Sequence, residues 1–366
     1  MNSLSICILL LLSIILFWQI KLSPGKTFFD NSFSLSVSKG IQGFFGLLII
    51  IHHVYTFLDS RRLPVEELSV FKHMGVYYIG FYFFCSGYGL ILSLHTKKDY
   101  LKGFLVRRFP MVLVPFFICN YAYMSVELLL GESFSMPELV AAFLGFLLLN
   151  SQMWFAVEIM LLYLIFFLLF SGLKSEKICV AIIALFIAIF TVFSMLGRHP
   201  ATLSNWFWGE WWYNATPLFL AGMIVAYHKK QIKDFVTAHY LVSILTALTG
   251  FVLFTILSNH ILNVRGYWTG VFLHKVEAYI FQVPSIMFFV MLVLLLLMKV
   301  RFHNAFLEFL GMFSLEIILV NGVFLESLKG VAIRYGIVSY LCLTVAGTFV
   351  AAVCLSRLKG HILEIK

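Results

Sequence analysis

Charge is what this sequence lacks most. Acidic and basic residues together make up 12% of its 366 residues, whereas about 25% is usual in a soluble protein. Hydrophobic residues make up 61% of the chain. Because a soluble protein of this length needs a polar surface, this composition excludes an ordinary soluble fold. It indicates that lipid surrounds most of the molecule.

Sequence motifs of metal centres, serine hydrolases and nucleotide-binding enzymes are also missing. There is no HExxH, no GxSxG and no Walker loop, and the six cysteines lie in apolar runs without CxxC spacing. We therefore expect no metal and no disulfide framework, with the cysteines acting as small apolar residues. The net charge of +9 is explained better by basic loops that set membrane topology than by nucleic-acid binding.

Long apolar runs fill the chain instead. A membrane-spanning helix needs about 20 mainly apolar residues. Eleven runs fit this template, and they lie near 3–20, 41–58, 74–94, 109–130, 153–172, 177–196, 213–228, 239–258, 277–299, 306–326 and 336–356. A shorter apolar piece at 137–149 is expected to be re-entrant or interfacial. The pattern predicts an all-α, polytopic membrane helix bundle with about 10–11 transmembrane helices, divided into an extra anchor helix with its linker (1–38) and one membrane domain (39–366).

The basic residues are divided unevenly between the two alternating sets of loops. One set carries eighteen of the 26 lysines and arginines. These are Lys21, Lys26, Lys39, Lys97, Lys98, Lys102, Arg107, Arg108, Lys174, Lys177, Lys229, Lys230, Lys233, Lys299, Arg301, Arg357, Lys359 and Lys366. By the positive-inside rule this set lies in the cytoplasm. We then expect the C-terminus to be inside. Because the first run lacks a basic n-region and a small-residue cleavage site, we also expect it to be an uncleaved anchor with its N-terminus outside.

One apolar run, KGIQGFFGLLIIIHHVYTF (39–57), carries polar side chains at a helical spacing. Gln42 and His53 are eleven residues apart, roughly three helical turns, and Lys39 falls within about 40° of the same face. His52 points to one side. Polar groups in the bilayer usually face a cavity or a partner, so His53 is either a general base in a pocket or a structural histidine bonded to a neighbouring helix. We favour His53 as the base, with His52 as the second candidate.

The same run resembles the first signature of the membrane acyltransferase-3 family, in which ten residues separate an arginine from a histidine. Here Gln42 stands in place of the arginine, and Lys39 can supply the missing charge. Five further stretches resemble family motifs in the same order, so that the resemblance runs from about 39 to 356. They are FYFFCSGYGLIL (81–92), LKGFLVRRFPMVLVPFF (101–117), MWFAVEIMLLYLIFFLLF (153–170), NATPLFLAGMIVAYHKK (214–230) and FLEFLGMFSLEIILVNGVFL (306–325).

This resemblance implies an integral-membrane O-acyltransferase of a bacterial cytoplasmic membrane. Such an enzyme moves an acyl group, here expected to be acetyl, from cytoplasmic acetyl-CoA or another acyl-CoA to a hydroxyl of an extracytoplasmic glycan or glycolipid sugar. Arginine forks suit phosphate oxygens, so Arg107 and Arg108 are expected to bind the donor together with Lys39 and Gln42. The alternative for the two arginines is a topology signal alone.

Glu158 is an isolated carboxylate in an apolar run, which makes it a candidate catalytic residue. A structural pair with an arginine is the alternative. Ser86 and Tyr88 could line a substrate pocket, although small residues such as those around Gly87 often serve only helix packing. Asn321 stands where many family members have a second histidine, and we assign it to the substrate site.

Tryptophans supply the remaining substrate-site candidates. Trp154 belongs to one of the stretches that resemble family motifs (153–170), and Trp211 belongs to the expected loop NWFWGEWWYN (205–214). Aromatic faces beside an acid suit a sugar, whereas an interfacial aromatic belt is the alternative. The expected partners are membrane lipid and a surface glycan or lipid-linked sugar, and a homodimer is compatible with the sequence.

Two other functions are open on this evidence. A transporter or flippase of lipid-linked sugars would also be polytopic, although such proteins often contain internal repeats and none is visible here. A glycan polymerase would call for a sizeable outer loop, and the outer loops of this chain are short. The acyltransferase is the leading hypothesis.

Overall fold

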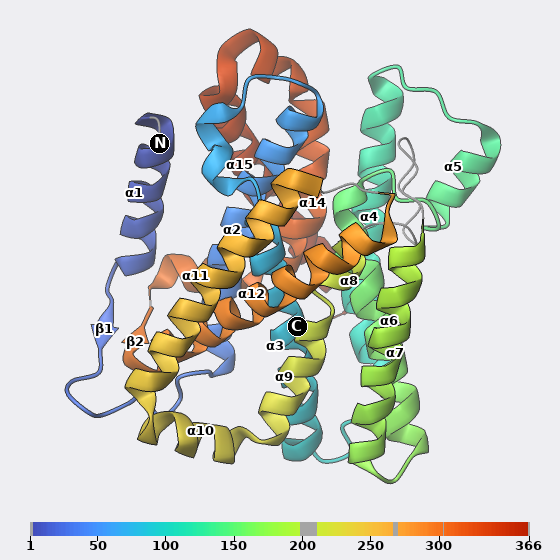
Figure 1. Ribbon diagram of the computed structural model, residues 1–366. Helices are drawn as coiled ribbons and strands as arrows, with labels where there is room; N and C mark the ends of the chain where they lie inside the picture. Colours follow the sequence, from blue (N-terminus) through green and yellow to red (C-terminus); the bar gives the residue numbers. More distant parts are fainter. Residues whose placement is uncertain (1–2, 198–210, 266–269, 303, 365–366) are drawn as a thin grey trace.

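The structure is a computed structural model that describes residues 3–197, 211–265, 270–302 and 304–364. It is a bundle of helices in which only two very short strands occur among these residues (Figure 1). The helices are α1 (Ser3–Phe17), α2 (Leu35–Ser60), η1 (Glu66–Phe71), α3 (Gly75–Thr96), α4 (Phe104–Leu129), α5 (Met136–Phe143), η2 (Ser151–Met153), α6 (Trp154–Gly172), α7 (Glu176–Leu196), α8 (Trp211–Asn214), α9 (Pro217–Tyr227), α10 (Lys229–Ala238), α11 (Tyr240–Arg265), α12 (Phe272–Lys299), α13 (Ala305–Met312), α14 (Ser314–Ser327) and α15 (Lys329–Ile362). The strands are β1 (Lys21–Leu22) and β2 (Val300–Arg301).

The described helices include eight that are long and apolar enough to cross a membrane. A ninth span results if α13 and α14, which are bent by 73° relative to each other, are counted together. The two remaining apolar runs form shorter helices, α1 and α9. The predicted all-α polytopic membrane bundle is thus confirmed, and the chain is a multi-pass membrane protein.

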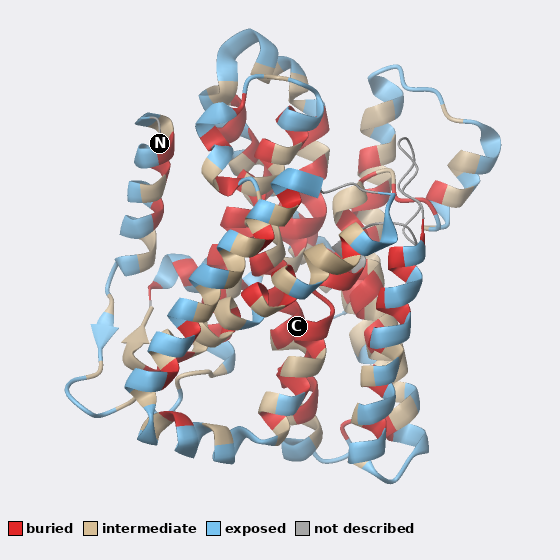
Figure 2. Cartoon of the chain, viewed as in Figure 1, coloured by how far each residue is buried: buried red, intermediate tan, exposed pale blue. Residues whose placement is uncertain are grey.

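Burial identifies α2 as the centre of the bundle. In its most apolar stretch 78% of the residues are buried, against 17% in α11, and Figure 2 shows buried residues concentrated inside the bundle and exposed ones outside. A helix that is apolar all round and buried belongs in a core. The exposed leucines and valines of α11 are then the surface that faces lipid.

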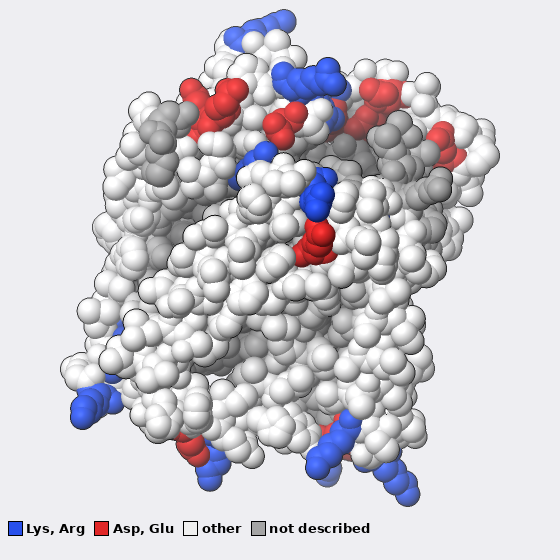
Figure 3. Space-filling view, viewed as in Figure 1, with Lys and Arg blue, Asp and Glu red and all other residues white. Residues whose placement is uncertain are grey.

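In the view of Figure 3, most charged side chains lie in the upper part and at the lower end of the bundle, with a largely uncharged zone between them, and one basic and acidic pair lies near the middle of this face. At the lower end lysine and arginine prevail, whereas the upper end carries both signs. We call the lower end, where α10 lies (Figure 1), the basic end. There β1 pairs with β2, with Lys21 opposite Arg301, which ties the segment after α1 to the end of α12.

The break between α13 and α14 lets α13 pack closely against the first turns of α2. A Cβ atom on Gly43 would overlap the backbone of Gly311, and one on Gly311 would overlap the carbonyl of Lys39. Past the break at Phe313, α14 continues alongside α2 and contacts it. This arrangement brings α14 residues next to the histidines of α2.

The helix pair α3–α9 also depends on glycine. A Cβ atom on Gly87 would overlap the carbonyl oxygen of Phe219, and one on Gly222 would overlap that of Phe84. We expect Gly87→Ala and Gly222→Ala each to lower the free energy of unfolding by about 1–3 kcal/mol, because overpacking displaces backbone. The measurement is reversible unfolding in mixed micelles.

Gly89 is the matched control, since it lies in the same helix with no atom within 4 Å of its added Cβ. Gly89→Ala should leave stability unchanged or raise it by about 0.5–1 kcal/mol, because alanine loses less backbone entropy than glycine on folding. Equal effects at Gly87 and Gly89 would contradict the assigned α3–α9 contact.

Candidate active site

A cavity of about 880 Å³ lies around the C-terminal half of α2, toward the end of the bundle opposite the basic end. Residues from seven membrane-spanning segments line it, namely α2, α3, α4, α6, α11, α12 and α14. Among the residues expected from the sequence, it brings together His52, His53 and Trp154. A pocket that combines apolar walls with a few convergent polar groups is the usual form of a small-molecule site.

His53 is held from the side by α14. Its Nδ1 lies 2.8 Å from the amide nitrogen of Asn321, whose side chain is fully buried. Asn321 itself is not among the residues that line the cavity. His53, on the predicted polar face of α2, therefore has its Nδ1 bonded inside the protein while its ring borders the cavity.

His52 has a different partner. Its Nδ1 lies 2.8 Å from the carbonyl oxygen of Phe71, at the end of η1. A carbonyl oxygen only accepts hydrogen bonds, so Nδ1 carries the hydrogen and Nε2 carries the lone pair. The imidazole also packs on Gly75, where any Cβ atom would overlap it. His52 thus fastens η1 and the start of α3 to α2, and its ring centroid lies 5.6 Å from that of His53.

Several polar residues of the cavity wall were not singled out from the sequence. Charged and titratable ones follow His53 closely along the chain, and amides come from distant helices. They are Asp59, Arg61, Lys72, His73, Asn150, Gln152, Asn263 and Gln282. The hydrophilic stretch that begins at the end of the histidine helix and continues after it was the available signal for the first four. Gln282 is an isolated amide in an apolar run, which is the same kind of signal that pointed to Gln42.

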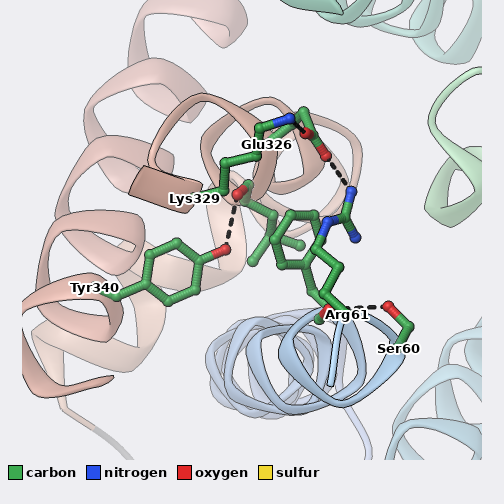
Figure 4. A network of polar contacts seen from close by, with 7 residues as sticks. Ser60, Arg61, Glu326, Lys329 and Tyr340 are labelled. Atoms are coloured by element: carbon green, nitrogen blue, oxygen red, sulfur yellow. Dashed lines mark hydrogen bonds and ion pairs between the residues drawn. The ribbon is translucent and has the colours of Figure 1, made fainter. Parts of the chain in front are cut away.

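An ion-pair network lies beside the cavity, where α2, α14 and α15 meet (Figure 4). Glu326 is buried, and its two carboxylate oxygens have different partners. Arg61 lies 2.5 Å from Oε2, and Lys329 lies 2.5 Å from Oε1. Tyr340 donates to the carbonyl of Leu325 at 2.7 Å, and Arg61 also lies over the ring of Phe57. Since Arg61 and Leu325 line the cavity, this network holds part of the cavity wall in place.

Glu158 lies one turn beyond Trp154 on α6 but does not line the cavity. It is buried and accepts a hydrogen bond from the hydroxyl of Thr216, just before α9. Two residues earlier, Asn214 donates to Gln282, which does line the cavity. Glu158 therefore belongs to a buried polar layer behind the cavity wall, where it is bonded to a threonine and where no arginine of the described residues pairs with it.

The residues expected to bind the donor lie nearer the basic end, and none of them lines the cavity. Arg107 and Arg108 both donate to Tyr100, to its carbonyl oxygen at 2.6 Å and to its hydroxyl at 2.9 Å respectively. Lys39 is exposed at the start of α2. The carbonyl oxygen of Gln42 accepts a hydrogen bond from Tyr82 at 2.5 Å.

The other substrate-site candidates from the sequence either lie away from the cavity or have side chains outside the described residues. Ser86 and Tyr88 flank the α3–α9 contact at Gly87, and the Tyr88 ring packs 4.9 Å from that of Phe33. Trp211 begins α8, but its side chain, like residues 198–210 before it, lies outside the described residues. The structure therefore gathers the two histidines, Asn321 and Trp154 at one place.

These observations define a class of protein: a multi-pass helical bundle with a histidine-lined cavity among its helices. Comparison with protein families narrows it. The model of the acyltransferase domain, that of the membrane acyltransferase-3 family, matches residues 36–356. The chain belongs to this family, which confirms the resemblance seen in its motifs, and it is a membrane acyltransferase. No curated protein and no solved structure matches it.

Proposed function

We propose that the protein transfers an acetyl group from acetyl-CoA, on the cytoplasmic side, to a hydroxyl of a glycan or glycolipid sugar on the other side of a bacterial cytoplasmic membrane. The observation that carries this proposal is the placement of His53. It borders a cavity of about 880 Å³ and is bonded through Nδ1 to a buried amide. Proton transfer to a positioned base of this kind contributes about 10²–10⁴-fold to a rate.

The reaction assigns one step to His53. The acceptor hydroxyl gives its proton to Nε2 while its oxygen attacks the thioester carbonyl. The tetrahedral intermediate then expels the CoA thiolate. His53 gives this thiolate the proton that it took from the hydroxyl, so that the products are the sugar ester and CoA–SH and no net proton is gained or lost.

The lining of the cavity supports a sugar as the acceptor. Gln152, Asn263 and Gln282 present amide groups, which can both donate to and accept from hydroxyls. Trp154 adds an aromatic ring that can contact the apolar side of a sugar. A polar but mostly uncharged wall of this kind suits a ligand with many hydroxyls.

The two ends of the bundle support the direction of transfer. The positive-inside rule places the basic end in the cytoplasm, which puts the cavity toward the outer side. Lys39, Arg107 and Arg108 lie toward the basic end, where the CoA phosphates would need cations. Gln42 and His53 are eleven residues apart on α2, so the acyl-bearing arm has to reach roughly 16 Å along the helix.

Release of CoA from radiolabelled acetyl-CoA by the protein in nanodiscs tests the proposal. We expect saturable acetyl-CoA binding and slow release of CoA to water, which needs no acceptor. Adding the correct glycan should speed this release and move the label to the sugar. A folded protein that neither binds nor turns over acetyl-CoA, with or without glycan, would overturn the proposal.

One feature favours a second candidate, a flippase of lipid-linked sugars. The span α13–α14 is bent by 73°, and broken helices are common in transporters. The same nanodisc preparation decides between the two, because a flippase would leave acetyl-CoA intact. Transfer of label to sugar would exclude a purely transporting role.

A further inference from the structure

The contact between Asn321 and His53 joins two helices that are far apart in the sequence. Asn321 lies on α14, beside α2, and its amide nitrogen is 2.8 Å from Nδ1 of His53. Its side chain is fully buried, and its amide oxygen has no hydrogen-bond partner among the described residues. Asn321 does not line the cavity. It can thus reach a ligand in the cavity only through His53.

The amide can meet Nδ1 in two ways. With the nitrogen facing Nδ1, the amide donates, and the ring hydrogen must sit on Nε2. A half-turn of the amide exchanges its nitrogen and oxygen in the same space. The oxygen then accepts a hydrogen bond from Nδ1–H, and Nε2 carries the lone pair.

A base at Nε2 requires the second arrangement. Neutral His53 can take a proton at Nε2 only if its hydrogen is on Nδ1. Once it has taken that proton, both ring nitrogens carry hydrogen, so a donor facing Nδ1 would repel it. An oxygen facing Nδ1 suits the ring before and after proton transfer.

We propose that Asn321 is a positioning residue for His53, with its amide oxygen toward Nδ1–H during turnover, so that Nε2 receives the acceptor's proton. This inference rests on the proposed function for the role of His53 as a base. It replaces the assignment of Asn321 to the substrate site. The same logic governs catalytic histidines whose second nitrogen is bonded to an asparagine.

Three substitutions of Asn321 show whether its role depends on accepting a hydrogen bond from His53 or only on the size of a buried side chain. Asn321→Leu keeps the approximate shape without polar atoms, and it should lower kcat by about 10²-fold, because a mobile or wrongly protonated ring misplaces the base. The KM for acetyl-CoA should stay unchanged. Asn321→Asp offers only oxygens, so it should retain most of kcat at the pH of its own maximum. Asn321→His, the residue of many family members, should rescue part of the rate.

Asn120→Ala is the matched control. Asn120 is fully buried like Asn321, but its amide donates to the carbonyl of Ala142 at 2.6 Å and does not touch the cavity. It should lower stability and leave kcat unchanged. If Asn321→Asp and Asn321→His fold and are both as inactive as Asn321→Leu, acceptance by Asn321 is not what His53 needs, and the inference is overturned.

Nitrogen-15 NMR of the His53 ring gives a readout that does not depend on acyl transfer. Its signals are assigned by their loss in His53→Gln. Asn321→Asp should hold the ring hydrogen on Nδ1, and Asn321→Leu should redistribute it between the two nitrogens. Identical ring signals in wild type, Asn321→Leu and Asn321→Asp would overturn the positioning role. If the ring signals change in the Asn321 variants but the wild-type protein does not turn over acetyl-CoA, the proposed function is refuted. The contact between Asn321 and His53 is then still established.

Discussion

Replacement of His53 by glutamine is expected to lower kcat by about 10²–10⁴-fold, the usual contribution of a positioned general base. Glutamine keeps a polar side chain beside Asn321 but cannot hold a proton at neutral pH. Because His53 is not among the residues near the basic end where the donor phosphates are expected, acetyl-CoA binding should remain. The measurement is CoA release and acetyl-CoA affinity on the same nanodisc preparation.

His52→Gln tests the other histidine of the cavity. Its ring is fixed to the backbone at Phe71 and packs on Gly75, so its loss should loosen η1 and lower stability more than it lowers the chemical step. His95→Gln serves as a control far from the cavity, since His95 pairs with Glu176 on the molecule's surface at 2.9 Å. Loss of turnover in His52→Gln with retention in His53→Gln would reverse the assignment of the base.

The helix geometry of a single segment was enough to place Gln42 and His53 on one face of α2, because an α-helix has a fixed turn. Of these two residues, His53 borders the cavity and Gln42 does not. The bonds of that histidine could not be predicted in the same way. Asn321 approaches His53 only because α14 runs beside α2 after the break at Phe313, and no local signal gives the bend between α13 and α14.

The partners of the buried carboxylates were equally hidden in the sequence. Glu158 was expected to be a catalytic residue or to pair with an arginine, and its hydrogen-bond partner among the described residues is the hydroxyl of Thr216. Glu316 pairs with Lys359, 43 residues away and near the other end of the last helix. Such pairs depend on helix–helix contacts, whereas hydropathy identifies only which segments cross the membrane. Composition therefore predicted the class of fold, and packing decided the polar contacts inside it.

The Glu316–Lys359 ion pair gives the largest expected effect on stability. Its side chains are only 2% and 11% exposed, and it joins the first turn of α14 to the end of α15. We expect Glu316→Gln to lower the free energy of unfolding by about 3–5 kcal/mol, because it leaves the lysine charge buried without its counter-charge. Reversible unfolding in mixed micelles measures this change.

A second substitution shows whether the lost charge pairing is the cause. Adding Lys359→Met to Glu316→Gln removes the orphaned charge and keeps a long apolar side chain, so the double variant should recover much of the stability. The exposed pair Lys233–Asp30, at 3.7 Å with side chains 43% and 99% exposed, is the control, because it lies outside the membrane-spanning helices. Asp30→Asn should change stability by less than about 1 kcal/mol, as is usual for an exposed ion pair. A double variant no more stable than Glu316→Gln would mean that Glu316 acts through its shape and hydrogen bonds, and that charge pairing is not what holds α14 to α15.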